Sequence, residues 1–384
     1  MLKKIIILIC LVIGTSIFCC LNFVNKSYFP DKTKIQLASW GSESEIRILK
    51  PILKDFEREN PDIEIDFMHI PQNYFQKLHL LFASNTAPDV IFINNHYLPI
   101  YANANVLEDL TPYSQEFEFE GLYNKSLEAL TWDKKIYAVP RDVSTLVVFY
   151  NKDLFNKFKV PYPNENWSIE EFLDTAGKLT HLPEIFGISF DEEPLFYLPY
   201  LTYFGVKDFA DMDSENYQKG LNFYSDLRNK YHYAPKKEEF ASATMAQMFL
   251  QGRLGMQISG RWLVPKFREE AKFDWDVVSF PKGVVPLDSS GWAIAKSSKH
   301  KKESIRLIQY LASDSSAEKF AQSGLIVPAR IQASKSKYFL DDQKPSNAKI
   351  FISIINSAVP TSVTVNFREV LDDLKTKTER IFNK

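Results

Sequence analysis

Short apolar strands and amphipathic helices alternate through the first hundred residues of the chain. Residues 34–39 alternate polar and apolar side chains, and residues 63–67 and 90–93 form two further strand-like runs. The segments between them, 46–56 and 74–84, carry apolar residues at helical spacing. This β-α-β-α-β order predicts parallel strands joined by helical crossovers. The chain is therefore expected to adopt an α/β fold.

Helix boundaries are marked by capping residues at several places. Ser168 and Glu171 have the spacing of a capping box, and Gly252 follows an apolar helical run as a left-handed C-cap. Ser315 and Glu318 predict the start of a later helix, which Gly324 would end. A last helix is expected over residues 368–382.

Length and composition favour a soluble protein of one or two domains. The chain has 384 residues, of which 45% are hydrophobic and 24% charged, as in globular proteins. At roughly 100–200 residues per domain, two domains or one large one are expected. The net charge of −2 argues against a general nucleic-acid-binding protein, which would carry a basic excess.

The N-terminus has the pattern of a membrane-targeting segment. Lys3 and Lys4 precede a run without charge over residues 5–24, which is also just long enough to span a bilayer. Residues 1–24 are therefore interpreted as a signal peptide, a lipoprotein signal or an N-terminal anchor. Lipid attachment at Cys20, an uncleaved helix and simple cleavage all remain open.

The sequence motifs of common catalytic and metal sites are missing from the remaining sequence. All three cysteines, at positions 10, 19 and 20, lie in the N-terminal segment, so no disulfide or thiolate site is expected beyond it. GxSxG, GxxxxGK[ST] and HExxH motifs do not occur, and the six histidines form no close pair. We expect no catalytic residues, no metal ligands and no cofactor.

Seven segments, in the same order, resemble the extracytoplasmic solute-binding proteins of ABC importers. The similarity is to the family 1 sugar-binding proteins, which include the maltodextrin-binding type, and it covers almost all of the chain after the N-terminal segment. The segments are PILKDFERENPDIEI, APDVIFINN, VLEDLTPY, DKKIYAVPRDVSTLVVFYNKDLF, NWSIEEFLDTAGKLT, MAQMFLQGRLGMQISGRW and SGWAIAKSSKHKKESIRLIQYLASDSSAEKFAQSGLIVPAR.

The resemblance implies a fold of the periplasmic-binding-protein type II kind, with two α/β lobes around a hinged ligand cleft. The N-terminal lobe would comprise residues 31–142 and 291–355. The C-terminal lobe would comprise residues 143–290 and 356–384. The chain would cross between the lobes near residues 142–146, 289–291 and 355–360.

The resemblance also implies a function and partners. The protein would bind a sugar or small oligosaccharide in the cleft and deliver it to the transmembrane subunits of an ABC permease, without being an enzyme. It would act as a monomer at the outer face of the cell membrane, held by its N-terminal anchor. Three alternatives stay open. The same fold could bind glycerol phosphate, a polyamine or iron instead of a sugar. The protein could also be a sensor subunit that presents its ligand, or a membrane-anchored carbohydrate-processing enzyme.

Some ligand-binding residues are predicted from their positions in the expected fold. Trp40 follows the first strand, where ligands of open α/β sheets bind, and Glu43 lies close behind it. Asp142 lies at the first crossing, Tyr197 in an aromatic segment of the second lobe, and Arg330 in a VPAR sequence. Each has a structural alternative, as a core aromatic residue, a helix-start carboxylate, or half of an ion pair.

The resemblance adds five further residues to the predicted site. The family places ligand contacts in the loop that holds Asn94 and Asn95, for which an Asn-rich turn is the alternative. It uses a tryptophan in the position of Trp262 as a platform for sugar rings, with Gly260 allowing a close backbone approach. Trp292 would lie at the second crossing.

Overall fold

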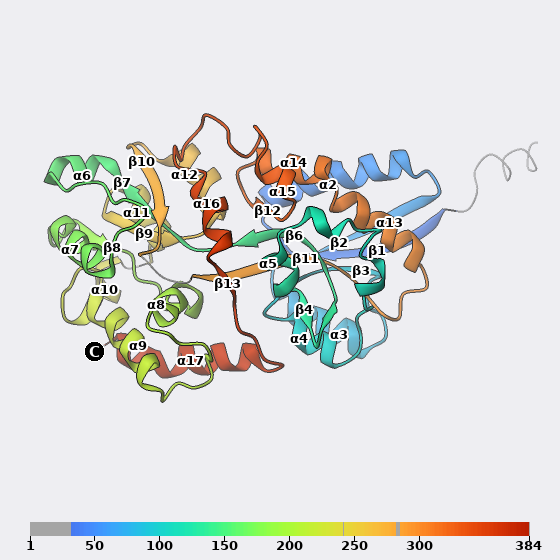
Figure 1. Ribbon diagram of the computed structural model, residues 1–384, viewed down its shortest axis with the longest axis horizontal. Helices are drawn as coiled ribbons and strands as arrows, with labels where there is room; N and C mark the ends of the chain where they lie inside the picture. The colour runs from blue at the N-terminus through green and yellow to red at the C-terminus, as the bar shows by residue number, and fades with distance from the viewer. Residues whose placement is uncertain (1–31, 241, 282–284, 384) are drawn as a thin grey trace, which may run out of the picture.

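The computed structural model describes residues 32–240, 242–281 and 285–383 as two lobes side by side along the long axis of the molecule (Figure 1). Each lobe has its own mixed sheet with helices packed around it. The expected α/β fold is therefore confirmed.

The N-terminal lobe contains a seven-stranded sheet in the order β12-β6-β11-β3-β1-β2, with β13 paired to β11. As predicted, the first three strands run parallel, and β1 pairs with both β2 and β3. The later strands β6, β11 and β12 add antiparallel pairs. The strands are β1(Thr33–Ser39), β2(Ile63–His69), β3(Val90–Asn94), β6(Val139–Ser144), β11(Pro286–Ile294), β12(Val327–Pro328) and β13(Val359–Pro360).

Helices cover both faces of this sheet and enclose two separate hydrophobic cores. One core contains Leu37 and Phe92 with residues of α2 and α13, and the other contains Ile91 and Ile93 with residues of α3 and α4. The two cores arise because successive side chains of a strand point to opposite faces. The helices are α2(Glu43–Glu59), α3(Tyr74–Ala83), α4(Leu98–Asn103), α5(Asn124–Ala129), α13(Lys301–Leu311), α14(Asp314–Gln322) and α15(Ile331–Ser334).

The C-terminal lobe is built on a four-stranded sheet in the order β10-β7-β9-β8. Its strands are β7(Val147–Asn151), β8(Phe186–Ile188), β9(Leu254–Ser259) and β10(Trp275–Ser279). One large hydrophobic core surrounds this sheet. The helices are α6(Lys152–Phe158), α7(Ile169–Leu179), α8(Leu198–Tyr203), α9(Glu215–Asn229), α10(Lys237–Phe240), α11(Met245–Leu250), α12(Val264–Glu270), α16(Ile350–Ser353) and α17(Phe367–Phe382).

Three segments connect the two sheets. Only two residues separate β6 from β7, which belong to different sheets. Strand β11 enters the N-terminal sheet from the C-terminal side, and β13 pairs with its first residues before the chain reaches α17 (Figure 1). The lobe boundaries given above stay predictions.

Most of the predicted helix caps are present. Ser168 and Glu171 form the capping box of α7, and Gly252 and Gly324 have φ angles of 71° and 74° after their helices. One prediction is wrong, because α14 begins two residues earlier than expected and its N-cap is Ser313, whose side chain accepts from the Ser316 amide.

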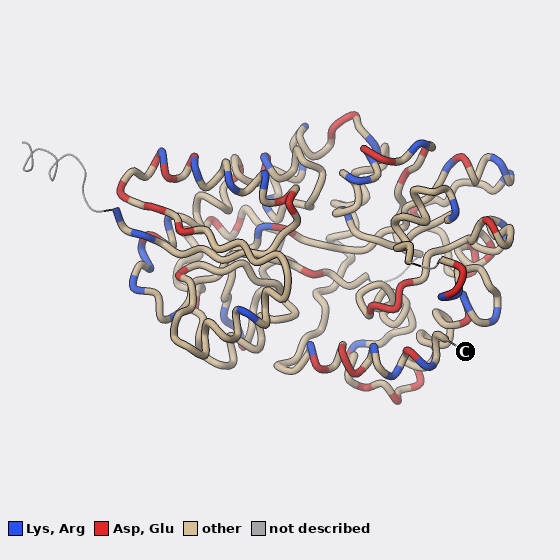
Figure 2. Tube along the Cα trace, turned by 180° about the vertical axis from the view of Figure 1, so that it is seen from behind, with Lys and Arg blue, Asp and Glu red and all other residues tan. Residues whose placement is uncertain are grey.

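The predicted targeting segment, with Cys20, lies outside the described residues. Among the residues that the structure does describe, none of the helices has both the length and the apolar character needed to cross a bilayer. Acidic and basic residues alternate along the outer helices, for example along α17, while the central strands carry few charges (Figure 2).

Candidate functional site

A cavity of about 370 Å³ lies between the lobes, close to the point where β6 leaves the N-terminal sheet. Three of the predicted ligand-binding residues, Trp40, Asp142 and Trp262, line it together. Trp40 comes from the N-terminal lobe and Trp262 from the C-terminal lobe, so the cavity has an indole on each side. The other lining residues are Ser42, Glu45, Arg141, Val143, Ser144, Thr145, Arg261, Ser290, Leu325, Ile326 and Val327.

Trp40 is held by a cluster of aromatic rings at the end of β1. Its ring centroid lies 4.4 Å from that of Phe92, 5.1 Å from Tyr74 and 5.2 Å from Phe75. The side chain is half-buried, which leaves part of the indole facing the cavity. Such packing fixes the ring before a ligand arrives, and this lowers the entropy cost of binding.

Glu45 is a cavity residue that sequence reasoning missed. The side chain of Ser42 caps α2 by accepting from the Glu45 amide, which places Glu45 in the first helical turn. Its carboxylate folds back over Gly41, where a Cβ atom would lie only 2.9 Å from Oε2 of Glu45. The Ser42-x-x-Glu45 spacing is that of a capping box, but the Glu45 carboxylate accepts from Arg141, so this local pattern does not predict that it reaches the cavity.

Arg141 holds the two cavity carboxylates in place. Its Nη1 donates to Glu45 at 2.5 Å, and its Nε and Nη2 both lie 2.6 Å from Oδ2 of Asp142. The guanidinium group also lies over the rings of Phe92 and Phe320, at 4.1 and 4.9 Å from their centroids. Burial raises the pKa of Asp142, and the nearby charge of Arg141 opposes this effect.

Trp262 follows β9 in a short turn and packs tightly on its own backbone. A Cβ atom at position 260 would fall 1.9 Å from Cζ3 of Trp262, so a glycine is required beneath the ring. Gly260 therefore contributes to the site by making room for the indole.

Arg261, between these two residues, is buried although it carries a charge. Only 3% of the residue is exposed, and its side-chain nitrogens have no hydrogen-bond partner among the described residues. Its guanidinium group lies over Phe339 and Phe351, at 3.8 and 5.1 Å from their centroids.

Three of the predicted residues near the first lobe lie outside this cavity. Glu43 is exposed in the first turn of α2, and the Asn94 side chain accepts from the Tyr97 amide within a turn. Asn95 is buried, and it donates to Asp288 at 2.9 Å and accepts from the Ser289 amide.

Three more of the predicted residues pack inside one lobe and do not face the cavity: Tyr197, Trp292 and Arg330. Tyr197 is fully buried in the C-terminal core, and Trp292 is fully buried 4.6 Å from Phe92 in the N-terminal lobe. Arg330 donates to the backbone carbonyls of Ala312, Phe117 and Glu118. None of the three lines the cavity, so we leave them out of the site proposed below.

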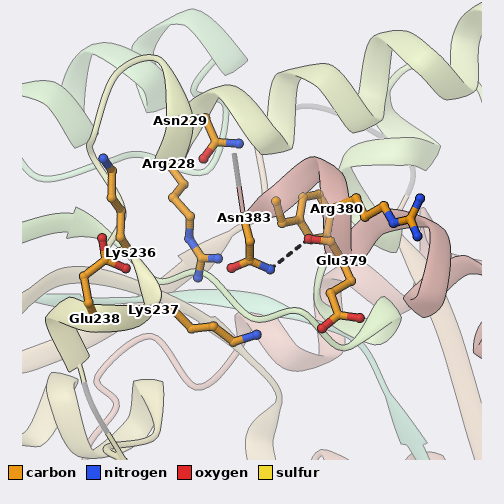
Figure 3. Close-up of a pocket in the computed structure, with 9 residues that line it drawn as sticks. Arg228, Asn229, Lys236, Lys237, Glu238, Glu379, Arg380 and Asn383 are labelled. Atoms are coloured by element: carbon orange, nitrogen blue, oxygen red, sulfur yellow. Dashed lines mark hydrogen bonds between the residues drawn. The ribbon is translucent and has the colours of Figure 1, made fainter.

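A larger cavity of about 630 Å³ lies in the C-terminal lobe beside α9 and α17 (Figure 3). Two of its charged residues have a partner outside the cavity lining: Arg228 pairs with Glu192 at 2.9 Å, and Lys237 lies 3.5 Å from the same residue. The walls come from the C-terminal lobe alone, so motion between the lobes would not close this cavity.

Metal ligands do not cluster in the described part of the chain. Within residues 32–240, 242–281 and 285–383 there is no group of three or more His, Cys, Asp or Glu side chains suited to an ion. The cavity between the lobes instead offers aromatic faces, two carboxylates and two arginines.

Comparison with known proteins identifies the family. The family described as bacterial extracellular solute-binding protein matches residues 52–346. The maltodextrin-binding protein MdxE of Bacillus subtilis is 24% identical over 347 residues, which cover 84% of this chain and 79% of MdxE.

Solved structures share the fold over almost the full length. The ABC substrate-binding protein Lmo0181 of Listeria monocytogenes, in complex with cycloalternan, has a TM-score of 0.83 at 25% identity, covering 92% of this chain and 94% of its own. The GacH receptor of Streptomyces glaucescens has a TM-score of 0.80 at 20% identity, covering 91% and 93%. These structural similarities confirm the expected two-lobe fold. Because the family match spans most of its length, the chain belongs to the bacterial extracellular solute-binding proteins.

Proposed function

We propose that this protein is the solute-binding component of an ABC importer and binds a sugar or small oligosaccharide between its lobes. The observation that carries the proposal is the pairing of Trp40 and Trp262 across one cavity with Glu45 and Asp142. Indole faces pack against the apolar face of a sugar ring, while carboxylate oxygens accept hydrogen bonds from its hydroxyl groups. The maltodextrin-binding relative and the cycloalternan-bound neighbour support the same ligand class.

Binding between two lobes suits delivery to a permease. A ligand that contacts both Trp40 and Trp262 would favour the closed arrangement of the lobes over the open one. The permease would then recognise the closed form as the loaded carrier.

The proposed role is binding without catalysis. Both cavity carboxylates are hydrogen-bonded to Arg141, which engages them in an ion pair. We would expect an oligosaccharide to be recovered unchanged after incubation with the protein, and chromatography of the mixture tests this.

The family places this protein outside the cytoplasm, and we propose that its N-terminal segment keeps it at the membrane. The anchor would be either a lipid attached to Cys20 or an uncleaved N-terminal helix. Mass spectrometry of the N-terminus, isolated from membranes, distinguishes a lipid-modified Cys20 from an intact Met1. A monomer, expected for a carrier with one cleft, is tested by light scattering.

The main experiment measures sugar binding to the full chain in a detergent without a sugar headgroup. Thermal shift and titration calorimetry would use linear and cyclic glucose oligomers and monosaccharides. A ligand at about 100 times its dissociation constant should stabilise the protein by roughly 2.7 kcal/mol. Trp262→Ala should abolish the shift, while Trp132→Phe, at a half-buried tryptophan outside the cavity, should retain it. If no sugar binds, the proposed ligand class is wrong.

A further inference from the structure

Glu45 and Asp142 share one positive charge in the wall of the cavity between the lobes. Arg141 donates to Oε1 of Glu45 at 2.5 Å, and its Nη2 lies 2.6 Å from Oδ2 of Asp142. Two carboxylates and one guanidinium group leave one negative charge in excess. The three residues are 7–8% exposed, and an uncompensated charge in such a place destabilises a fold.

Arg261 does not supply the second positive charge, although it belongs to the same cavity wall. Its three side-chain nitrogens are buried from solvent, without a hydrogen-bond partner among the described residues. The guanidinium group packs over Phe339 and Phe351, which do not line the cavity. The excess negative charge therefore stays with the two carboxylates.

Each carboxylate keeps one oxygen for a ligand. Arg141 donates to Oε1 of Glu45 and Oδ2 of Asp142, whereas Oε2 and Oδ1 accept no hydrogen bond from the described residues. Neither of these two oxygens is among the buried side-chain atoms that lack a partner, so both are open to solvent. Of the side chains, 11% is exposed for Glu45 and 10% for Asp142. A ligand in the cavity can therefore reach both residues.

A neutral sugar would leave the charge imbalance in place. Burial raises the pKa of Asp142, the negative charge of Glu45 adds to this effect, and Arg141 opposes it. A hydroxyl group donates a hydrogen bond to a carboxylate but brings no charge. Closure of the lobes would remove further water from the excess charge, and only a cationic group of the ligand would compensate it.

We infer that the saccharide bound in this cavity carries a protonated amino group, which pairs with Glu45 and Asp142. This inference rests on the proposed function and narrows its ligand class to amino sugars. Trp40 lines the cavity from the same lobe, and the face of an indole attracts an ammonium group. The amino group would therefore lie on the N-terminal side, and the neutral part of the ligand would extend toward Trp262.

Matched pairs of ligands test this directly. Glucosamine, galactosamine and short glucosamine oligomers would be compared by calorimetry with glucose, galactose and glucose oligomers of the same length and linkage. In each pair an amino group replaces one hydroxyl group of the ring. With the full chain, we expect at least one amino sugar to bind about tenfold or more tightly than its neutral counterpart, as charged hydrogen bonds imply. Added salt should reduce this difference.

Two variants separate the cavity carboxylates from the general charge of the lobe. Asp142→Asn should weaken binding of the amino sugar far more than binding of its neutral counterpart. Its unliganded form should keep or raise its melting temperature, because the amide oxygen still accepts from Arg141 and the excess charge is gone. Glu43→Gln is the matched control: it removes the same charge two residues from Glu45, at an exposed position outside the cavity. This variant should keep the preference for the amino sugar.

The outcomes are distinct for the two proposals. If neutral sugars bind and amino sugars bind no more tightly, the inference is overturned and the proposed function stands. If Glu43→Gln lowers the preference as much as Asp142→Asn does, the charge of the whole lobe selects the ligand, and the inference also fails. If spermidine binds and no saccharide does, both proposals fail.

Discussion

The ring of Trp262 occupies the space that a side chain at Gly260 would need. A Cβ atom there would lie 1.9 Å from Cζ3 and 2.4 Å from Cη2 of the indole. No side chain can be accommodated without moving the ring, because both distances are far below van der Waals contact. The orientation of this proposed sugar platform is thus set by a neighbouring glycine.

Gly260→Ala should therefore weaken sugar binding while the protein stays folded. The displaced Trp262 ring would lose its stacking contact, and we expect the affinity for whichever neutral sugar binds best to fall by about tenfold. Calorimetry measures the loss. Gly252→Ala is the control: its φ is positive, at 71°, unlike the −98° of Gly260, but no atom lies within 4 Å of the added Cβ. That variant should lose stability by about 1 kcal/mol and bind normally, and equal binding by both variants would contradict the assignment of Gly260.

Arg141→Met should destabilise the protein strongly. It leaves Glu45 and Asp142 buried without their shared cation, a change that typically costs about 3–5 kcal/mol. Urea unfolding followed by fluorescence measures the loss. Adding Glu45→Gln and Asp142→Asn to Arg141→Met should recover much of it, because the buried charges are then removed. No recovery in the triple variant would show that packing on Phe92 and Phe320, rather than charge, is what Arg141 provides.

Asp191 should make stability fall as the pH rises from about 4 to 7. Burial raises the pKa of Asp191 to about 7, with Glu193 adding to the effect and Arg228 opposing it, whereas an unfolded aspartate titrates near about 3.9. The folded protein thus binds the extra proton in this range, and stability decreases by up to about 1.4 kcal/mol per pH unit. Above the pKa of Asp191 in the folded protein, this contribution to stability is lost completely.

Unfolding free energies of the wild type and Asp191→Asn, measured from pH 4 to pH 8, check this prediction. The difference between the two proteins should change steadily up to about pH 7 and then level off. A difference that is constant over the whole range would show that Asp191 is ionised in the folded state.

Asn94 and Asn95 should respond differently to the same substitution. Asn95→Ala removes a donor to Asp288 and leaves the buried Ser289 amide unpaired, which should cost about 1–3 kcal/mol. Asn94→Ala removes one turn contact to the Tyr97 amide and should cost well under half as much. Denaturant titration of the two variants tests the ranking, and a larger loss in Asn94→Ala would reverse our interpretation of this loop.

The sequence predicted the elements of the fold better than the positions of its site residues. The parallel strands β1, β2 and β3 and the capping box at Ser168 follow from local patterns, and they agree with the structure. Trp40, Asp142 and Trp262 were predicted from strand ends, crossings and family resemblance, and they do line one cavity.

The remaining site residues depend on contacts that no local pattern specifies. Trp292 and Arg330 were predicted from their places in the chain, yet their side chains turn into the core and toward backbone carbonyls. Glu43 and Glu45 are two positions apart, and only the helix start at Ser42 decides which one faces the cavity. The unpaired state of Arg261 arises from distant residues, Phe339, Phe351 and Asp341, that the fold brings near it.

The contacts of Asn95 restrict where strand β11 can bend. By binding both the Asp288 carboxylate and the Ser289 amide, Asn95 fastens β11 to the first lobe up to residue 288. A rotation of the lobes would then be taken up before that point, where residues 286 and 287 of β11 lie beside residues 359 and 360 of β13. The β6–β7 crossing would have to bend in the same rotation, and Ser144 and Thr145 of that crossing line the cavity. The rotation would then reshape this part of the cavity wall while Trp40 stays with the N-terminal sheet.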